Sequence, residues 1–153
     1  MDKKTYLISA CLLGLCTRYD GGHNRSEKVL QFCNRHICLP ICPEQLGGLP
    51  TPRPPAEISG GDGEDVLARR CSVIDRSGND VTGAFLLGAR QTLMLARLFN
   101  VAGAVLKARS PSCGLGCIHD GTFRGSFRSG DGVTAALLKK HGYHVLDENE
   151  LAY

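Results

Sequence analysis

Residues 6–11 read Tyr-Leu-Ile-Ser-Ala-Cys, a short apolar run that ends directly at a cysteine. A run of this length, bounded by a Gly-rich segment, predicts a buried strand over Tyr6–Ala10. The same order recurs at Ile37–Ile41, which is followed directly by Cys42. It recurs once more at Ala102–Lys107, which is followed by a short loop and another cysteine. Each of three predicted strands is therefore followed by a cysteine, and this repeated pattern is the main feature of the sequence.

Helical segments alternate with these strands. Amphipathic periodicity predicts helices over Ser26–Arg35, Asp80–Asn100 and Gly132–His141. Two further short strands are predicted at Ser72–Ile74 and Tyr143–Leu146. Because continuously apolar strands alternate with helices, the predicted fold class is α/β. We expect a single domain, residues 1–153, built on an open, mainly parallel sheet flanked by helices in a Rossmann-like three-layer arrangement.

Caps, breakers and loops set the limits of these elements. Ser26 and either Asp80 or Thr82 are expected to cap the first two helices, and Gly142 to end the last. Pro40 argues against a central place for its strand, because proline cannot donate a hydrogen bond to a neighbouring strand. Stretches rich in Gly, Pro or polar residues predict loops at Gly47–Pro55, Ser59–Asp65 and Ser110–Arg128.

Charge and composition exclude several classes of function. The formal net charge of the 153 residues is only +3 and there is no Trp, so neither a membrane nor a nucleic acid is indicated as a partner. The glycine-rich stretch 60–63 lacks the dinucleotide fingerprint, and the chain has no Walker A motif. NAD and ATP binding are therefore not expected, and the oligomeric state is not readable.

The eight cysteines indicate a reducing compartment, where such thiols serve metal, cluster or thiol chemistry rather than disulfides. Residues 8–11 resemble a lipoprotein cleavage site, but the apolar run before Cys11 is shorter than the roughly 7–15 residues of a signal core. No apolar run approaches the roughly 20 residues that span a bilayer. The expected location is the cytoplasm.

Cys11, Cys42 and Cys113 each follow a predicted strand. Because the carboxyl ends of parallel strands meet at one edge of a sheet, these thiols are expected to converge there. Thiolates are the usual ligands of iron–sulfur clusters, and three of them would leave one iron of a cubane open as a Lewis acid. Soft iron suits a sulfur atom of a substrate.

Other readings of the cysteines stay open at this point. Cys113 with Cys117 is also compatible with half of a zinc site, or with a redox thiol pair of a sulfur carrier that binds no iron. Cys16 lies close to Cys11 and is not assigned. Burial in the core is the expected role of the remaining thiols, Cys33, Cys38 and Cys71.

Seven blocks of sequence resemble the thiouracil desulfidase family, from Tyr6 to about Leu151. These blocks are residues 9–14, 18–21, 42–48, 52–57, 110–114, 120–123 and 130–135. The resemblance implies a 4Fe–4S cluster on Cys11, Cys42 and Cys113, and removal of sulfur from 2-thiouracil to give uracil and sulfide without net redox change. It also implies an acidic residue near the substrate, which matches Glu44, and a serine from the segment 110–112.

The mechanism expected from these residues is a metal-assisted hydrolysis in which Glu44 takes a proton from water. Ser110 or Ser112 would hydrogen bond to the ring or pass a proton. Asp20 is a candidate substrate residue, although an Asp-Gly step more often makes a turn. Arg53 is expected either to clamp an anionic substrate or to pair with Glu57.

The expected partner is a small thiolated base, and the mild net charge argues against whole tRNA. Among the histidines, only His119 is considered as a metal ligand, because it follows Cys117 closely.

Overall fold

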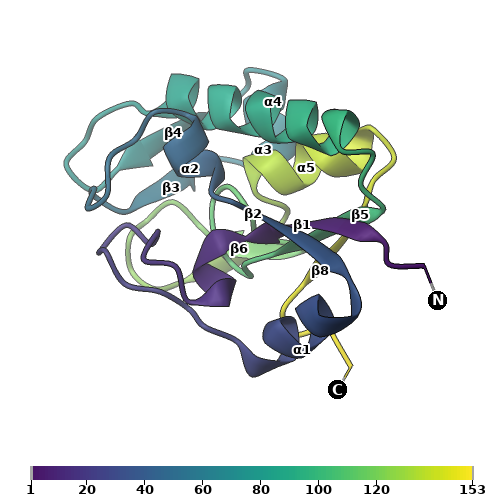
Figure 1. The fold of residues 1–153 in the computed structure, drawn as a ribbon. Coiled ribbons are helices and arrows are strands. Elements are labelled where there is room, and N and C mark those ends of the chain that lie inside the picture. Colours follow the sequence, from purple (N-terminus) through teal and green to yellow (C-terminus); the bar gives the residue numbers. More distant parts are fainter. Residues whose placement is uncertain (1, 153) are drawn as a thin grey trace.

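A four-stranded parallel sheet forms the centre of the computed structural model, which describes residues 2–152. The strands lie in the order β2-β1-β5-β8, and each neighbouring pair is parallel (Figure 1). Their bounds are β1 Thr5–Ser9, β2 Ile37–Ile41, β5 Gly103–Leu106 and β8 His144–Asp147. The predicted parallel sheet is confirmed.

Helices cover both faces of this sheet. In Figure 1, α4 (Thr82–Leu98) and α5 (Val133–Lys140) lie above the sheet, and α1 (Glu27–Arg35) lies below it. Alternate residues of the central strands bury into two separate cores: Leu7 packs with the α4 and α5 side, and Ile8 packs with the α1 side. A strand buried on both faces must be apolar throughout, which explains the unbroken apolar runs.

Pro40 sits in β2, at the edge of the sheet, where it is paired with Ile8. An edge strand needs a ladder on one side only, so it tolerates a residue without an N–H group. The expectation that this strand is not central is confirmed.

The helix ends differ slightly from prediction. Ser26 caps α1 by accepting a hydrogen bond from the Val29 amide, 3.4 Å from its Oγ. The long helix is shorter than the predicted Asp80–Asn100, because Asp80 accepts a bond from the Thr82 amide just outside it. At the other end Asn100 adopts a left-handed φ of 48°, which an α-helix cannot continue.

Two small antiparallel sheets and two short helices were not predicted, although one strand of the first sheet was, at Ser72–Ile74. β3 (Ala56–Ser59) pairs with β4 (Ser72–Asp75), and β6 (Cys117–His119) pairs with β7 (Phe127–Ser129). The short helices are α2 (Pro43–Leu46) and α3 (Gly63–Leu67), and a 3-10 turn, η1, spans Ala10–Leu13. The loops predicted at Ser59–Asp65 and Ser110–Arg128 are therefore partly wrong. Such short elements carry too few residues to show periodicity.

Within residues 2–152, no helix combines the length and apolarity needed to cross a membrane.

Candidate active site

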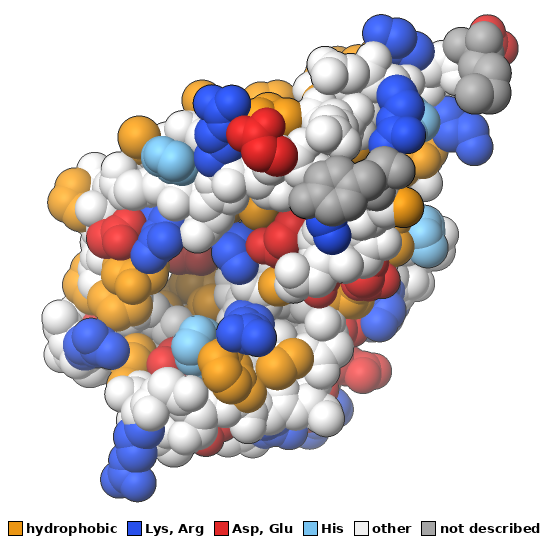
Figure 2. All heavy atoms as spheres, turned by 90° about the horizontal axis from the view of Figure 1, so that it is seen from below, with side chains coloured by type: hydrophobic (Ala, Val, Ile, Leu, Met, Phe, Trp, Pro, Cys, Tyr) orange, Lys and Arg blue, Asp and Glu red, His pale blue; other side chains and the backbone are white. Residues whose placement is uncertain are grey.

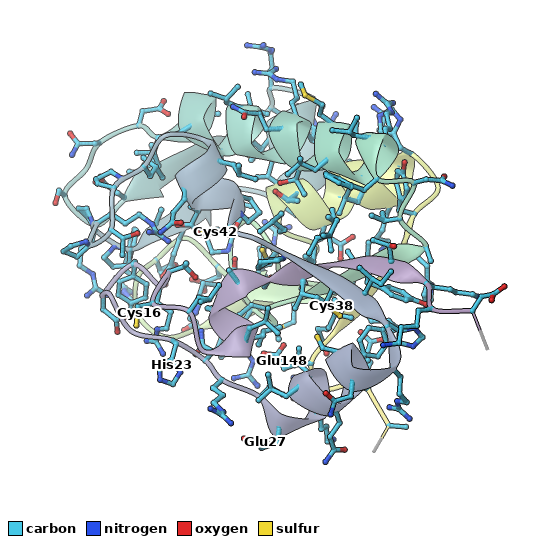
Figure 3. All side chains as sticks on the ribbon, in the orientation of Figure 1. Cys16, His23, Glu27, Cys38, Cys42 and Glu148 are labelled. Atoms are coloured by element: carbon cyan, nitrogen blue, oxygen red, sulfur yellow. The ribbon has the colours of Figure 1, made fainter. Side chains whose placement is uncertain are left out.

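Three thiols meet at the carboxyl edge of the parallel sheet. Cys11 lies in η1 directly after β1, Cys42 precedes α2 directly after β2, and Cys113 lies in the loop that follows β5. All three line one cavity of about 400 Å³. Figure 3 shows Cys42 where β2 passes into α2, and the face seen in Figure 2 is hollowed, with charged side chains of both signs around the hollow. The structure thus brings together the cysteines that the sequence placed at one edge.

The Cys113 loop is held by the N-terminus of α5. The amide of Val133 donates to the Pro111 carbonyl at 2.8 Å, and the amide of Thr134 donates to the Ser112 carbonyl at 2.8 Å. These bonds satisfy amides that a helix cannot pair internally. A Cβ at Gly132 would lie 2.5 Å from the Ser112 carbonyl carbon, so only glycine permits this approach.

Cys42 is placed by the contact of α2 with α4. An added Cβ at Gly47 would overlap the Ala84 carbonyl, and one at Gly88 would overlap the Pro43 carbonyl. Two glycines facing each other therefore let the helices approach closely. Because α2 begins next to Cys42, this contact fixes the second thiol and the residues that follow it.

Burial dominates the chemistry of these thiols. It raises the pKa of Cys11 and of Cys42, and it raises the pKa of Cys113 to about 12 despite hydrogen bonds from Ser9 and Ser112. Negative charge on Cys42 and Cys11 raises the Cys113 pKa further, so the three groups are close enough to interact. Three desolvated thiols side by side become stable thiolates only next to positive charge, which a metal centre supplies.

The donor set fits an iron–sulfur cluster better than a single metal ion. Across residues 2–152, no group of three His, Cys, Asp or Glu side chains is arranged around one ion position. A cubane binds each thiolate through a different iron, so its ligands need not converge on one point. The thiolate chemistry, the shared cavity and the small neighbouring residues all fit a cluster held by Cys11, Cys42 and Cys113.

Glu44 lines the same cavity and is held on both oxygens. Its Oε1 accepts a hydrogen bond from Arg53 Nε at 3.0 Å, and its Oε2 accepts one from Ser112 Oγ at 3.1 Å. The ion pair is largely removed from solvent, since the side chains of Arg53 and Glu44 are 4% and 16% exposed. The carboxylate is therefore fixed beside the thiols without being sealed from the cavity.

Ser110 and Ser112 form a chain of contacts that ends at the Glu44 carboxylate. Ser112 Oγ lies 3.1 Å from Glu44 and 3.6 Å from Cys113 Sγ. Ser110 Oγ lies 3.0 Å from Ser112 Oγ and accepts the amide N–H groups of Ser112 and Cys113. Ser112 therefore makes the direct contact with the carboxylate, and Ser110 shapes the turn that presents it.

Comparison with known proteins shows the family of this chain. The 2-thiouracil desulfurase family matches residues 6–150. This chain belongs to that family. A curated relative, the uncharacterized protein YbbK of Bacillus subtilis (strain 168), is 50% identical over 145 residues, which cover 95% of this chain and 96% of YbbK.

A solved structure of the [4Fe-4S]-dependent thiouracil desulfidase TudS is 43% identical to this desulfurase-family chain, with a TM-score of 0.82. The match covers 97% of this chain and 93% of the TudS chain. Family and fold therefore agree over almost the full length, as the sequence blocks indicated.

Asp20 and Arg53, the two residues proposed for the substrate, have different outcomes in this family member. Asp20 does not line the cavity: it pairs with Arg18 at 3.0 Å and accepts the Gly22 amide at 2.9 Å, which makes it a turn residue. Arg53 does line the cavity, and of its two expected roles the pairing with Glu57 is wrong, because its carboxylate partner is Glu44. Besides Glu44, its guanidinium donates to Thr17, Pro50 and Thr51, so all three of its nitrogens hold protein acceptors.

The other cysteines lie outside the cavity lining. Cys16 is exposed in the loop after η1, and Cys117 lies in β6 (Figure 3 labels Cys16). Cys38 hydrogen bonds with Cys33 on the α1 side of the sheet, where burial raises the Cys38 pKa. Cys71 donates to the Asp62 carbonyl at 3.7 Å. Packing therefore accounts for Cys33, Cys38 and Cys71, as expected.

One wall of the cavity was not foreseen. It includes Thr17, Lys107 and Arg109 from loops, with His119 and Phe127 from the β6–β7 hairpin. The only signal in the sequence was the closeness of His119 to Cys117, which suggested a metal ligand. No periodicity marks a three-residue strand, so the hairpin that brings His119 and Phe127 to the cavity could not be read from the sequence.

Proposed function

We propose that this chain is a [4Fe–4S]-dependent desulfidase that removes sulfur from 2-thiouracil, giving uracil and sulfide without net redox change. The observation that carries the proposal is the meeting of three buried thiols with one fixed carboxylate in a single cavity. Membership of the 2-thiouracil desulfurase family and the likeness to TudS support the same reaction.

Cys11, Cys42 and Cys113 would hold the cluster. When bound, the cluster supplies an iron that carries no protein thiolate and can act as a Lewis acid toward the thione. The remaining groups of the cavity belong to the chain, and they bind the base and move protons.

Glu44 acts as the general base that takes a proton from the attacking water. Arg53 holds Oε1 and Ser112 holds Oε2, so the carboxylate enters the reaction already oriented. Each oxygen keeps a second lone pair for a water molecule. Ser112 is the serine in contact with Glu44 and Cys113, and Ser110 positions it from behind.

The substrate is a small molecule. A cavity of about 400 Å³ lies in the range of small-molecule sites, which is about 300–1,000 Å³. The small net charge of +3 favours a free base over a large polyanion. All eight cysteines are free thiols, which supports a reducing, cytoplasmic location for the enzyme.

Anaerobic reconstitution with iron and sulfide, followed by a sulfide-release assay on 2-thiouracil, tests the proposal. Wild-type protein is expected to bind about four iron and four sulfide per chain, to absorb broadly near about 400 nm and to release sulfide with uracil. Cys113→Ser should lose both the absorbance and sulfide release. Cys16→Ser, at an exposed thiol outside the cavity, is the matched control and should keep both.

Two results would refute this function. Colourless wild-type protein after reconstitution would exclude the cluster. A fully loaded protein that releases no sulfide from 2-thiouracil would exclude the substrate.

A further inference from the structure

His119 lines the cavity but has no place in the mechanism described so far. Its Nδ1 atom is buried and has no hydrogen-bond partner. The nearest carboxylate oxygen is Glu57 Oε2, 4.0 Å away. Buried polar atoms are nearly always paired, so an imidazole nitrogen left this close to a carboxylate requires an explanation.

Glu57 is buried, and backbone hydrogen bonds fix its carboxylate. It lies in β3, is 7% exposed, and its Oε1 accepts the amide N–H groups of Gly121 at 2.9 Å and Phe123 at 3.1 Å. These two bonds tie β3 to the turn of the β6–β7 hairpin. They leave the second oxygen, Oε2, on the side of His119.

The imidazole ring is also in contact with an aromatic ring. The Phe127 ring lies opposite His119 in the hairpin, with ring centroids 4.8 Å apart and an interplanar angle of 39°. The guanidinium of Arg109 lies 4.8 Å above the Phe127 ring. The ring of His119 therefore has both a fixed carboxylate and an aromatic ring as neighbours.

This placement selects the tautomer of His119. An ionised carboxylate offers only acceptor oxygens, so Glu57 Oε2, at 4.0 Å too far for a hydrogen bond, favours by its charge the tautomer that carries the proton on Nδ1. The neutral ring then has its lone pair on Nε2. Nδ1 is buried, while the side chain as a whole is 37% exposed and lines the cavity, so Nε2 is the ring nitrogen left for a group in the cavity.

The proposed reaction needs a second proton acceptor. Exchange of a C=S group for a C=O group consumes one water, and both protons of that water must leave the oxygen and end on the sulfur. Glu44 takes the first. Lys107, paired with Glu148 at 3.0 Å, and the arginines of the cavity are cations and accept no proton. Glu57 also lines the cavity, but its Oε1 accepts two amide N–H groups and its Oε2 lies on the side of His119.

We propose that His119, positioned by Glu57, is that second acceptor. The inference rests on the proposed function. As the new C–O bond becomes a carbonyl, Nε2 takes the hydroxyl proton of the adduct, and the C–S bond breaks with its electron pair on sulfur. The imidazolium and the protonated Glu44 then return their protons to the sulfide, which leaves as hydrogen sulfide and restores both bases.

His119→Ala tests the inference in anaerobically reconstituted, cluster-loaded protein. The cluster spectrum is expected to match wild type, while kcat falls about 10²–10⁴-fold, the usual contribution of a general acid or base. Millimolar imidazole in the assay should restore kcat by tenfold or more in His119→Ala and leave Glu44→Gln unchanged. His144→Ala, at an exposed histidine on the opposite edge of the sheet, is the matched control and should keep wild-type kcat.

Failure of this inference differs from failure of the proposed function. If wild-type protein releases no sulfide, the function itself is wrong. If wild type is active and His119→Ala keeps kcat within twofold, or loses kcat that imidazole does not restore, the proton-transfer role is overturned. His119→Gln, which keeps the size of the side chain, answers the same question if the alanine variant does not fold: wild-type kcat in it overturns the role, and a hundredfold loss supports it.

Glu57→Gln tests whether Glu57 acts by positioning His119 or only by packing in the hairpin. The amide keeps the acceptor for Gly121 and Phe123, but it places no charge beside His119. We expect a lower kcat with an unchanged KM, and no further loss when the change is combined with His119→Ala. Full additivity of the two losses would contradict a shared role.

Discussion

Glu44 and Arg53 form the best-buried ion pair of the cavity, and the pair is asymmetric in what it does. Every nitrogen of the Arg53 guanidinium donates to a protein acceptor, so the role of Arg53 is to orient Glu44. Glu44 keeps lone pairs toward the cavity. Removing charge from one partner of such a pair leaves the other uncompensated, which makes the choice of substitution important.

Glu44→Gln is the sharpest single change at this scale. The amide oxygen can still accept from Arg53 or Ser112, but glutamine cannot take a proton from water. We expect the cluster to bind as in wild type while sulfide release slows by about 10²–10⁴-fold. Iron content and the visible spectrum are measured together with kcat. Turnover within twofold of wild type would remove Glu44 from the mechanism.

The sequence indicated the proposed ligands and the proposed base at this scale, but not their neighbours. Cys11, Cys42 and Cys113 are visible because each follows an apolar strand. The pairing of Arg53 with Glu44 was missed, since the path of the Gly- and Pro-rich segment between them has no pattern that fixes it. Asp20 was assigned to the substrate only because it lies near Cys11 along the chain, and it does not line the cavity.

Among the secondary-structure elements, the contact between α2 and α4 controls the site most directly. Gly88 of α4 faces the Pro43 carbonyl, and α2 begins there with Cys42 and Glu44 beside it. A side chain at position 88 would push α2 away from the helix that supports it. The cluster ligand and the base would move together.

Gly88→Ala therefore has two opposite effects on stability, one on the helix itself and one on its contact with α2. Alanine raises intrinsic helix propensity by about 1 kcal/mol over glycine, but its Cβ overlaps a backbone carbonyl. We expect lower stability in urea denaturation and loss of cluster content. Gly83→Ala is the matched control in the same helix, because nothing lies within 4 Å of its added Cβ, and it should stabilise by about 0.4–1 kcal/mol. Equal behaviour of the two variants would show that the α2–α4 contact is not tight.

The elements that sequence could predict are those long or apolar enough to carry a pattern. The four parallel strands and the three long helices were predicted, with ends shifted by one or two residues. Of the strands in the β3–β4 and β6–β7 pairs, only β4 was predicted. These strands are three or four residues long and depend on their pairing partners, so tertiary contacts decide them. The missed hairpin is also the one that carries His119.

At the scale of the whole molecule, the cluster would join segments that only folding brings together. The three thiols come from chain positions 11, 42 and 113, and each follows a different strand. An unfolded chain does not present them as one site. The free energy of cluster binding is therefore also free energy of folding.

Removal of the cluster should consequently lower thermal stability. A ligand at a hundred times its Kd stabilises the native state by about 2.7 kcal/mol, which for a domain of this size corresponds to about 5–10 °C in Tm. Anaerobic thermal unfolding of reconstituted and chelator-treated protein measures the difference. Cys113→Ser, which lacks one ligand, should show a much smaller shift under the same treatment. An equal Tm for loaded and chelated wild-type protein would mean that the three thiols do not bind one cluster that connects the ends of their strands.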